Sequence, residues 1–168
     1  MALGISLGWL TVRDGVETMT WKLVQTQEDA DALMASFGDF HDACFKEAHL
    51  WTSHWVGADL SMACSDDLDT RVRFLFQRQV AAPSSIELLF EQVTRLNLVP
   101  SPSGFFSIIF EATLLVTDEG VYWSSEAGWK PSDPERDGST WISAKNLRWR
   151  EVDRMGEEFR YGPREEQG

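Results

Sequence analysis

The stretch TQEDADALMASFGDFHDACFKEAHLWTSHWV, residues 26–56, decides the fold. Thr26 is a candidate helix N-cap, and Asp29 three residues later is an Asp variant of the capping-box pattern. Apolar residues then recur at the helical spacing i, i+3, i+4 and i+7: Ala30, Leu33, Met34 and Phe37. Gly38 is a typical stop. The pattern predicts one short helix that leads into a strand opening with Phe40-His41-Asp42.

The strand predicted over 42–56 has two mixed faces. One face carries Phe45, Glu47, His49, Trp51 and Trp55, and the other carries Cys44, Lys46, Ala48, Leu50 and His54. A strand without a cleanly apolar face is typical of a sheet edge, a bulge or the wall of a cleft.

The rest of the chain reads mostly as strands and turns. Alternation predicts strands at 5–12 and 16–24, joined at Asp14-Gly15, and a strand at 71–80 with Val72, Phe74, Phe76 and Val80 on its apolar face. Residues 86–98 suit a strand with a bulge near Glu91, but a helix over 87–96 fits their period as well. A second hairpin is expected from 105–117 and 121–124, and a closing strand at 141–150. The inner face of this second hairpin would hold Phe106, Ile108, Phe110, Ala112, Leu114 and Val116.

These elements predict a mainly β (α+β) fold, an antiparallel β-sandwich or a strongly curved sheet with one short N-terminal helix packed on it. A single domain over 1–150 is expected, in which 1–18 is an optional extension if translation starts at Met19. Residues 125–140 are expected to form a surface loop, and 151–168 an acidic, disordered tail.

The chain carries a net charge of −12, and residues 1–70 hold twelve acidic side chains against three basic ones. So acidic a surface repels phosphate backbones, which excludes nucleic acid as the expected ligand and favours a basic protein partner. The simpler interpretation is that the charge only maintains solubility. No apolar run is long enough to span a membrane, no signal peptide is recognised, and Cys44 and Cys64 are too few for a disulfide framework. A cytoplasmic protein is therefore expected.

A polar group of side chains is the first candidate site: His41, Asp42, Glu47, His49 and Arg78. Glu47 and His49 beside Arg78 would suit acid–base chemistry, and His41-Asp42 could contribute to a metal site. Against this, the sequence contains no HExxH or CxxC spacing, no nucleophile signature and no phosphate loop, so neither a metal nor a cofactor is predicted. The alternative is that His41 and Asp42 tie the helix to the strand, and that Glu47, His49 and Arg78 form structural ion pairs.

The tryptophans are the second candidate, because Trp is enriched where one protein grips another. Trp129 lies in a loop rich in proline and glycine and is expected to be exposed. Trp51 and Trp55 lie in the strand predicted over 42–56. Together with Asp66, Asp67 and Asp69 they would form an acidic, aromatic surface for a partner. The alternative places most of these rings in the core or in cross-strand pairs.

Several segments resemble an uncharacterised family of small bacterial proteins: FHDAC-FKEAHLW at 40–51, DLSM at 59–62, VRFLFQRQ at 72–79, LNL at 96–98, and later EATLLV, VYW and WISAKNLRWRE. The resemblance covers roughly residues 19–151 and brings no known activity. The Phe40-His41-Asp42 entry after a short helix is also similar to β-rich immunity proteins of bacterial toxin systems, which implies neutralisation of a toxin by binding.

The leading hypothesis is thus a bacterial, cytoplasmic, non-catalytic binding protein of the immunity type, with a basic protein as its partner. A small metal-binding or acid–base enzyme using the region of His41, Asp42, Glu47 and His49 is the second hypothesis. A structural homodimer with tryptophans at its two-fold interface is the third.

Overall fold

The computed structural model describes residues 20–80, 82–101, 103–104, 106–133, 136–153 and 155–162. The strand predicted at 5–12, the optional extension 1–18 and the last part of the predicted tail, 163–168, lie outside these ranges. No helix in the described part of the chain is long and apolar enough to cross a membrane.

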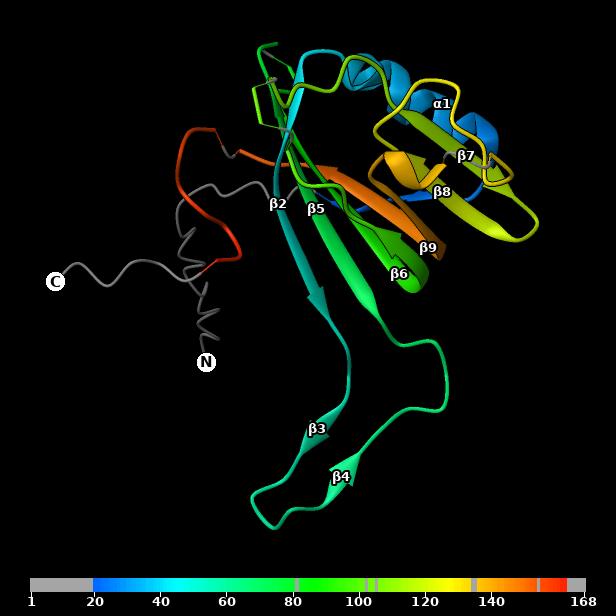
Figure 1. The fold of residues 1–168 in the computed structure, drawn as a ribbon, viewed down its shortest axis with the longest axis vertical. Coiled ribbons are helices and arrows are strands. Elements are labelled where there is room, and N and C mark those ends of the chain that lie inside the picture. Colours follow the sequence, from blue (N-terminus) through cyan, green and yellow to red (C-terminus); the bar gives the residue numbers. More distant parts are fainter. Residues whose placement is uncertain are drawn as a thin grey trace, which may run out of the picture.

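Seven antiparallel strands form one sheet in the order β2-β5-β6-β9-β8-β7, and β1 also pairs with β9 (Figure 1). The strands are β1 (Lys22–Val24), β2 (Ala43–Trp51), β5 (Arg71–Arg78), β6 (Ser85–Asn97), β7 (Thr113–Thr117), β8 (Gly120–Ser124) and β9 (Trp141–Glu151). Two more short strands, β3 (Trp55–Val56) and β4 (Met62–Ala63), pair only with each other. The mainly β fold with one short helix is as predicted.

The helix α1 (Gln27–Ser36) begins where its capping residues predict. The Thr26 hydroxyl accepts a hydrogen bond from the backbone N–H of Asp29, and the Asp29 carboxylate accepts those of Gln25 and Thr26. These bonds satisfy N–H groups that the helix leaves open, and they lower the pKa of Asp29. Gln27 then fastens the helix to β7: its side chain donates to the Leu114 carbonyl and accepts from the Val116 N–H.

One face of the sheet, called here the inner face, forms the core with α1. Phe74 and Phe76 on β5 alternate with residues that point to the other, outer face, and both rings are fully buried. The same alternation runs through β6 and β9, and the helix contributes Ala30, Leu33 and Phe37. Phe40 enters this core from the short 3₁₀ turn η1 (Gly38–Phe40) and meets Phe37, Phe76 and Trp123 edge-on or tilted.

The seven strands form one bent sheet. Of the two architectures expected from the sequence, the curved sheet is therefore present in the described residues and the β-sandwich is not. The ladder between β2 and β5 slips between Phe45 and Glu47, and that between β6 and β9 slips between Val93 and Arg95. Such bulges bend a strand and increase its twist. The bulge and the edge position predicted for β2 are both present, and 86–98 is a strand rather than a helix.

The hairpin predicted from residue 105 is wrong in its first half, because β7 starts only at Thr113. Phe106 and Phe110 are 89% and 71% exposed, whereas Ile109 is buried. The backbone here bonds the turn before β2 and the first residue of β2: the N–H of Asp42 donates to Ile109, that of Ile109 to Ala43 in an isolated antiparallel bridge, and that of Ala112 to Asp39.

Two further sequence predictions need correction. The strand at 141–150 does not close the sheet but lies inside it, paired with β6 on one side and with β8 and β1 on the other. Val80, expected on the apolar face of the 71–80 strand, is 49% exposed because β5 ends at Arg78. The loop before β9 contains the 3₁₀ turn η2 (Arg136–Gly138).

Candidate functional site

The turn between α1 and β2 holds His41 at the surface. Asp39, Phe40 and Asp42 all have positive φ angles, between 53° and 63°, which side-chain-bearing residues seldom adopt. Burial of the Phe40 ring and the backbone bonds to 109–112 hold this strained turn in place. The His41 imidazole therefore points outward, with its Nδ1 3.1 Å from a carboxylate oxygen of Asp42.

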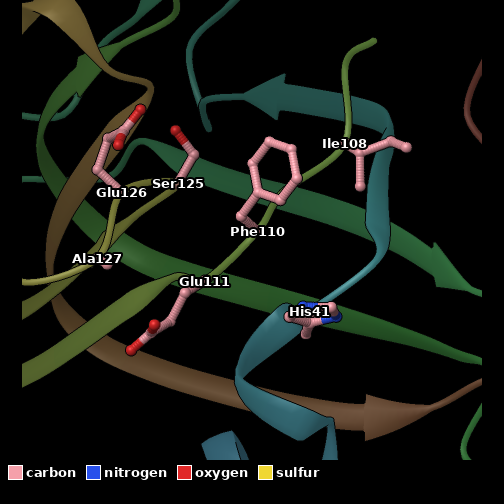
Figure 2. Close-up of a pocket in the computed structure, with 7 residues that line it drawn as sticks. All are labelled: His41, Ile108, Phe110, Glu111, Ser125, Glu126 and Ala127. Atoms are coloured by element: carbon pink, nitrogen blue, oxygen red, sulfur yellow. The ribbon is translucent and has the colours of Figure 1, made fainter.

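An open pocket of about 360 Å³ lies beside His41. Figure 2 shows the Phe110 ring across its middle, with Ser125 and Glu126 on one side and Ile108 and His41 on the other. Glu111 and Glu126 have no ion pair among the described residues, and no lysine or arginine lines the pocket. Two carboxylates with no lysine or arginine in the lining suit a cation.

The structure separates the five polar residues proposed as a site. Glu47 and His49 lie on the outer face of β2, whereas Arg78 lies on the inner face beneath α1. Arg78 is 7% exposed and donates to the carbonyls of Ser36 and Pro83, at 3.1 and 2.9 Å, while its guanidinium stacks on Phe37. It holds the end of the helix, and burial lowers its pKa. The predicted acid–base grouping of Glu47 and His49 with Arg78 is therefore wrong, because these residues project from opposite faces of the sheet.

Glu47 and His49 instead belong to a charged cluster on the outer face. Its centre is Glu87 on β6, whose carboxylate is fully buried and accepts from Arg150 on β9 at 2.6 Å. Arg160 and the Tyr161 hydroxyl bind the other carboxylate oxygen. Burial, reinforced by the bond to Glu87, raises the pKa of Tyr161 far above its usual value.

Two tryptophans border this cluster. The Arg73 guanidinium lies over the rings of Trp21 and Trp51, and that of Arg150 over Trp21. The Nε of Arg73 is buried and has no hydrogen-bond partner among the described residues. Trp51 is half-buried and also stacks on His49, so this tryptophan is part of the sheet surface and not a free anchor.

Glu87, Arg160 and Tyr161 were not predicted from the sequence as site residues. The disordered tail predicted from residue 151 is wrong for 155–162, because this segment lies across the outer face and is bonded to it. The sequence does contain a signal for Glu87, because this residue interrupts the apolar run from Ile86 to Phe90. A carboxylate in a buried strand requires basic partners.

Residues 52–70 form an arm that extends from the ends of β2 and β5, away from α1 (Figure 1). Its only regular structure is the β3–β4 ribbon, in which Trp55 pairs with Ala63 and Val56 with Met62. His54 closes the base of the arm by an ion pair with Asp69 at 3.2 Å, and Asp69 also accepts the Ser53 N–H.

Of the proposed partner-binding residues, the arm carries Trp55, Asp66 and Asp67. Trp55 is 59% exposed, and neither Asp66 nor Asp67 has an ion pair among the described residues. Asp69 is engaged with His54. Trp129, predicted to be exposed, is buried: its ring packs against Trp141 and Tyr122, and its backbone N–H donates to Thr113.

The described residues form neither a metal site nor a disulfide. Within the described ranges, no set of three or more His, Cys, Asp or Glu side chains is placed to hold a metal ion. Cys44 and Cys64 are both exposed and free. Comparison with known proteins gives no match to a family model, to a curated protein or to a solved structure.

Proposed function

We propose that this chain is a bacterial cytoplasmic binding protein that recognises a basic protein partner through its arm, residues 52–70. The observation that carries the proposal is the exposure of large apolar side chains on this arm. Val56, Leu60 and Met62 are 60%, 84% and 72% exposed, in addition to Trp55. A lone two-stranded ribbon with both faces uncovered is only marginally stable in water, and such exposed apolar patches mark interaction sites.

The charge of the arm favours a basic partner. No lysine or arginine occurs between Lys46 and Arg71, whereas the arm contains four aspartates. Two of these aspartates shape the arm: Asp59 accepts from the Ser61 N–H and hydroxyl, and Asp69 binds His54. Asp66 and Asp67 are therefore available to bind a positively charged surface of a partner. The same negative charge opposes the pairing of two arms in a homodimer.

The nature of the partner follows from the sequence resemblance. Similarity of the Phe40-His41-Asp42 entry to β-rich immunity proteins suggests a bacterial toxin as the basic partner. In the structure Phe40 is a core residue, and His41 lies before the start of β2 whereas the arm follows its end, so this entry supports the fold while the arm supplies the contact.

Affinity purification from the bacterial host tests the proposal. The wild-type chain should retain a basic protein in stoichiometric amount at low salt, and the association should weaken as salt rises. Trp55→Ala should weaken binding about 30-fold, the effect of losing a 2 kcal/mol hot spot. Phe106→Ala removes a ring elsewhere that is even more exposed, 89% against 59% for Trp55, and serves as the control.

Two results would contradict this function. One is a partner retained equally by the wild-type chain and by Trp55→Ala. The other is a concentration-dependent homodimer in analytical ultracentrifugation that Trp55→Ala abolishes, since the arm would then bind a second copy.

A further inference from the structure

The segment 156–161 lies on the outer face of the sheet in the manner of a bound peptide. The Glu47 carboxylate accepts two successive backbone N–H groups, that of Arg160 at 2.7 Å and that of Tyr161 at 2.8 Å. Lys46 donates to the backbone carbonyl of Glu157 at 2.8 Å. Main-chain groups of the segment are thus held by side chains of β2, whatever side chains the segment itself carries.

Glu87 and His49 contact the side chains of the segment. The Arg160 guanidinium binds the buried Glu87 carboxylate at 2.7 Å, and the Tyr161 hydroxyl donates to the same oxygen. The Tyr161 ring stacks on His49 with centroids 5.6 Å apart, and the Lys46 ammonium lies 4.9 Å from the Phe159 ring. These contacts define a preference for the sequence aromatic–Arg–Tyr.

The strands retain the site without the segment. Glu87 stays paired with Arg150 through its second oxygen, so the oxygen that binds Arg160 and Tyr161 would lose both partners and be open to another donor. Glu47 likewise projects from the sheet and not from the segment. A carboxylate oxygen that has lost its partners is a strong acceptor for a charge-assisted bond.

The segment itself contributes little apolar burial. Met155 and Phe159 are 55% and 59% exposed, so its attachment rests on polar contacts that a competitor can replace. Segments with few buried apolar contacts open locally at low cost in free energy.

We infer that this part of the outer face is a peptide-binding site for an aromatic–Arg–Tyr segment of a partner protein, and that the chain's own residues 157–161 occupy it in cis. A tethered segment of this kind acts at an effective concentration on the order of 1 mM. If the chain's own segment has an intrinsic Kd of about 0.1 mM for the site, a partner segment would bind roughly tenfold more weakly while the cis segment competes with it.

Fluorescence anisotropy with a labelled synthetic peptide of residues 155–162 tests this inference. The full-length double variant Arg160→Ala/Tyr161→Ala opens the site and should bind the peptide at least tenfold more tightly than the wild-type chain. Adding Glu87→Gln to the double variant should abolish binding, as should Arg160→Ala within the peptide. Near-ultraviolet circular dichroism establishes that each variant is folded.

The inference is overturned if the folded double variant does not bind at millimolar peptide, or if it binds no better than the wild-type chain. Should the double variant not fold, Tyr161→Phe decides: it keeps the ring and loses only the hydroxyl bond to Glu87, and it must bind the peptide more tightly than the wild-type chain. Trp55→Ala should leave peptide binding unchanged, so failure here is separate from failure of the arm.

Discussion

Replacing Glu87 by Gln removes the charge at the centre of the outer-face cluster and should destabilise the fold. The carboxylate is fully buried and accepts from Arg150, Arg160 and Tyr161. Removing one partner of a buried ion pair costs about 3–5 kcal/mol, because the remaining charge is left uncompensated. The Arg150 and Arg160 side chains are 21% and 25% exposed, so water offsets part of this loss. We expect the free energy of unfolding to fall by about 2–4 kcal/mol.

Urea denaturation measures this change, and an unaltered dependence on urea concentration shows that the same surface unfolds. Glu91→Gln is the matched control, since Glu91 lies on the same strand and face and is paired with Arg148 at 2.9 Å and Arg71 at 3.8 Å. Those arginines are 48% and 42% exposed, so the control should lose at most about 1 kcal/mol. Equal losses in the two variants would refute the argument that burial of Glu87 gives the cluster its strength.

Three further outcomes follow from single features. Thr26→Ala removes the cap of α1 and should lower the free energy of unfolding by about 1 kcal/mol in urea denaturation, while Thr26→Ser should retain the wild-type value. Gly38→Ala places a Cβ 2.6 Å from the Arg78 guanidinium at a φ of +55°, so thermal unfolding should show a loss of about 1–3 kcal/mol; a neutral result would contradict the close approach. The raised pKa of Tyr161 means that the folded chain keeps a proton that the unfolded chain loses above pH 10, so stability should be complete below pH 10 and fall as the pH rises beyond it. The stability of Tyr161→Phe should fall less steeply above pH 10 than that of the wild-type chain. Parallel pH profiles for the two proteins would contradict the assignment of this effect to Tyr161.

Local signals predicted those parts of the fold that depend on few neighbours. The capping pair Thr26 and Asp29 and the helical spacing after them act within one turn of helix, and α1 is where they predict. The alternation of Val72, Phe74 and Phe76 likewise predicts β5 and its buried face. Residues 86–90 are continuously buried, and because such a run suits either period, only its pairing with β5 and β9 decides for a strand.

The candidate site depended on long-range pairing that the sequence does not display. Arg78 pairs with Ala43, which places it on the face opposite to that of Glu47 once the bulge in β2 is counted. Trp129 lies among turn-forming residues, yet its ring is covered because the loop folds back on Tyr122 and Trp141. The contact between Tyr161 and Glu87 spans 74 positions of the chain, and no local pattern encodes it.

The position of β9 governs the order in which the molecule can assemble. This strand is made late in the chain, and yet β1, β6 and β8 all depend on it for hydrogen bonds. While the ribosome has delivered only residues up to 140, the hairpins on either side lack their common neighbour, and the aromatic rings of β5 and β6 have an incomplete layer around them. Cooperative folding of this sheet must therefore await synthesis of β9, and until then the growing polypeptide exposes apolar surface of the kind that chaperones bind.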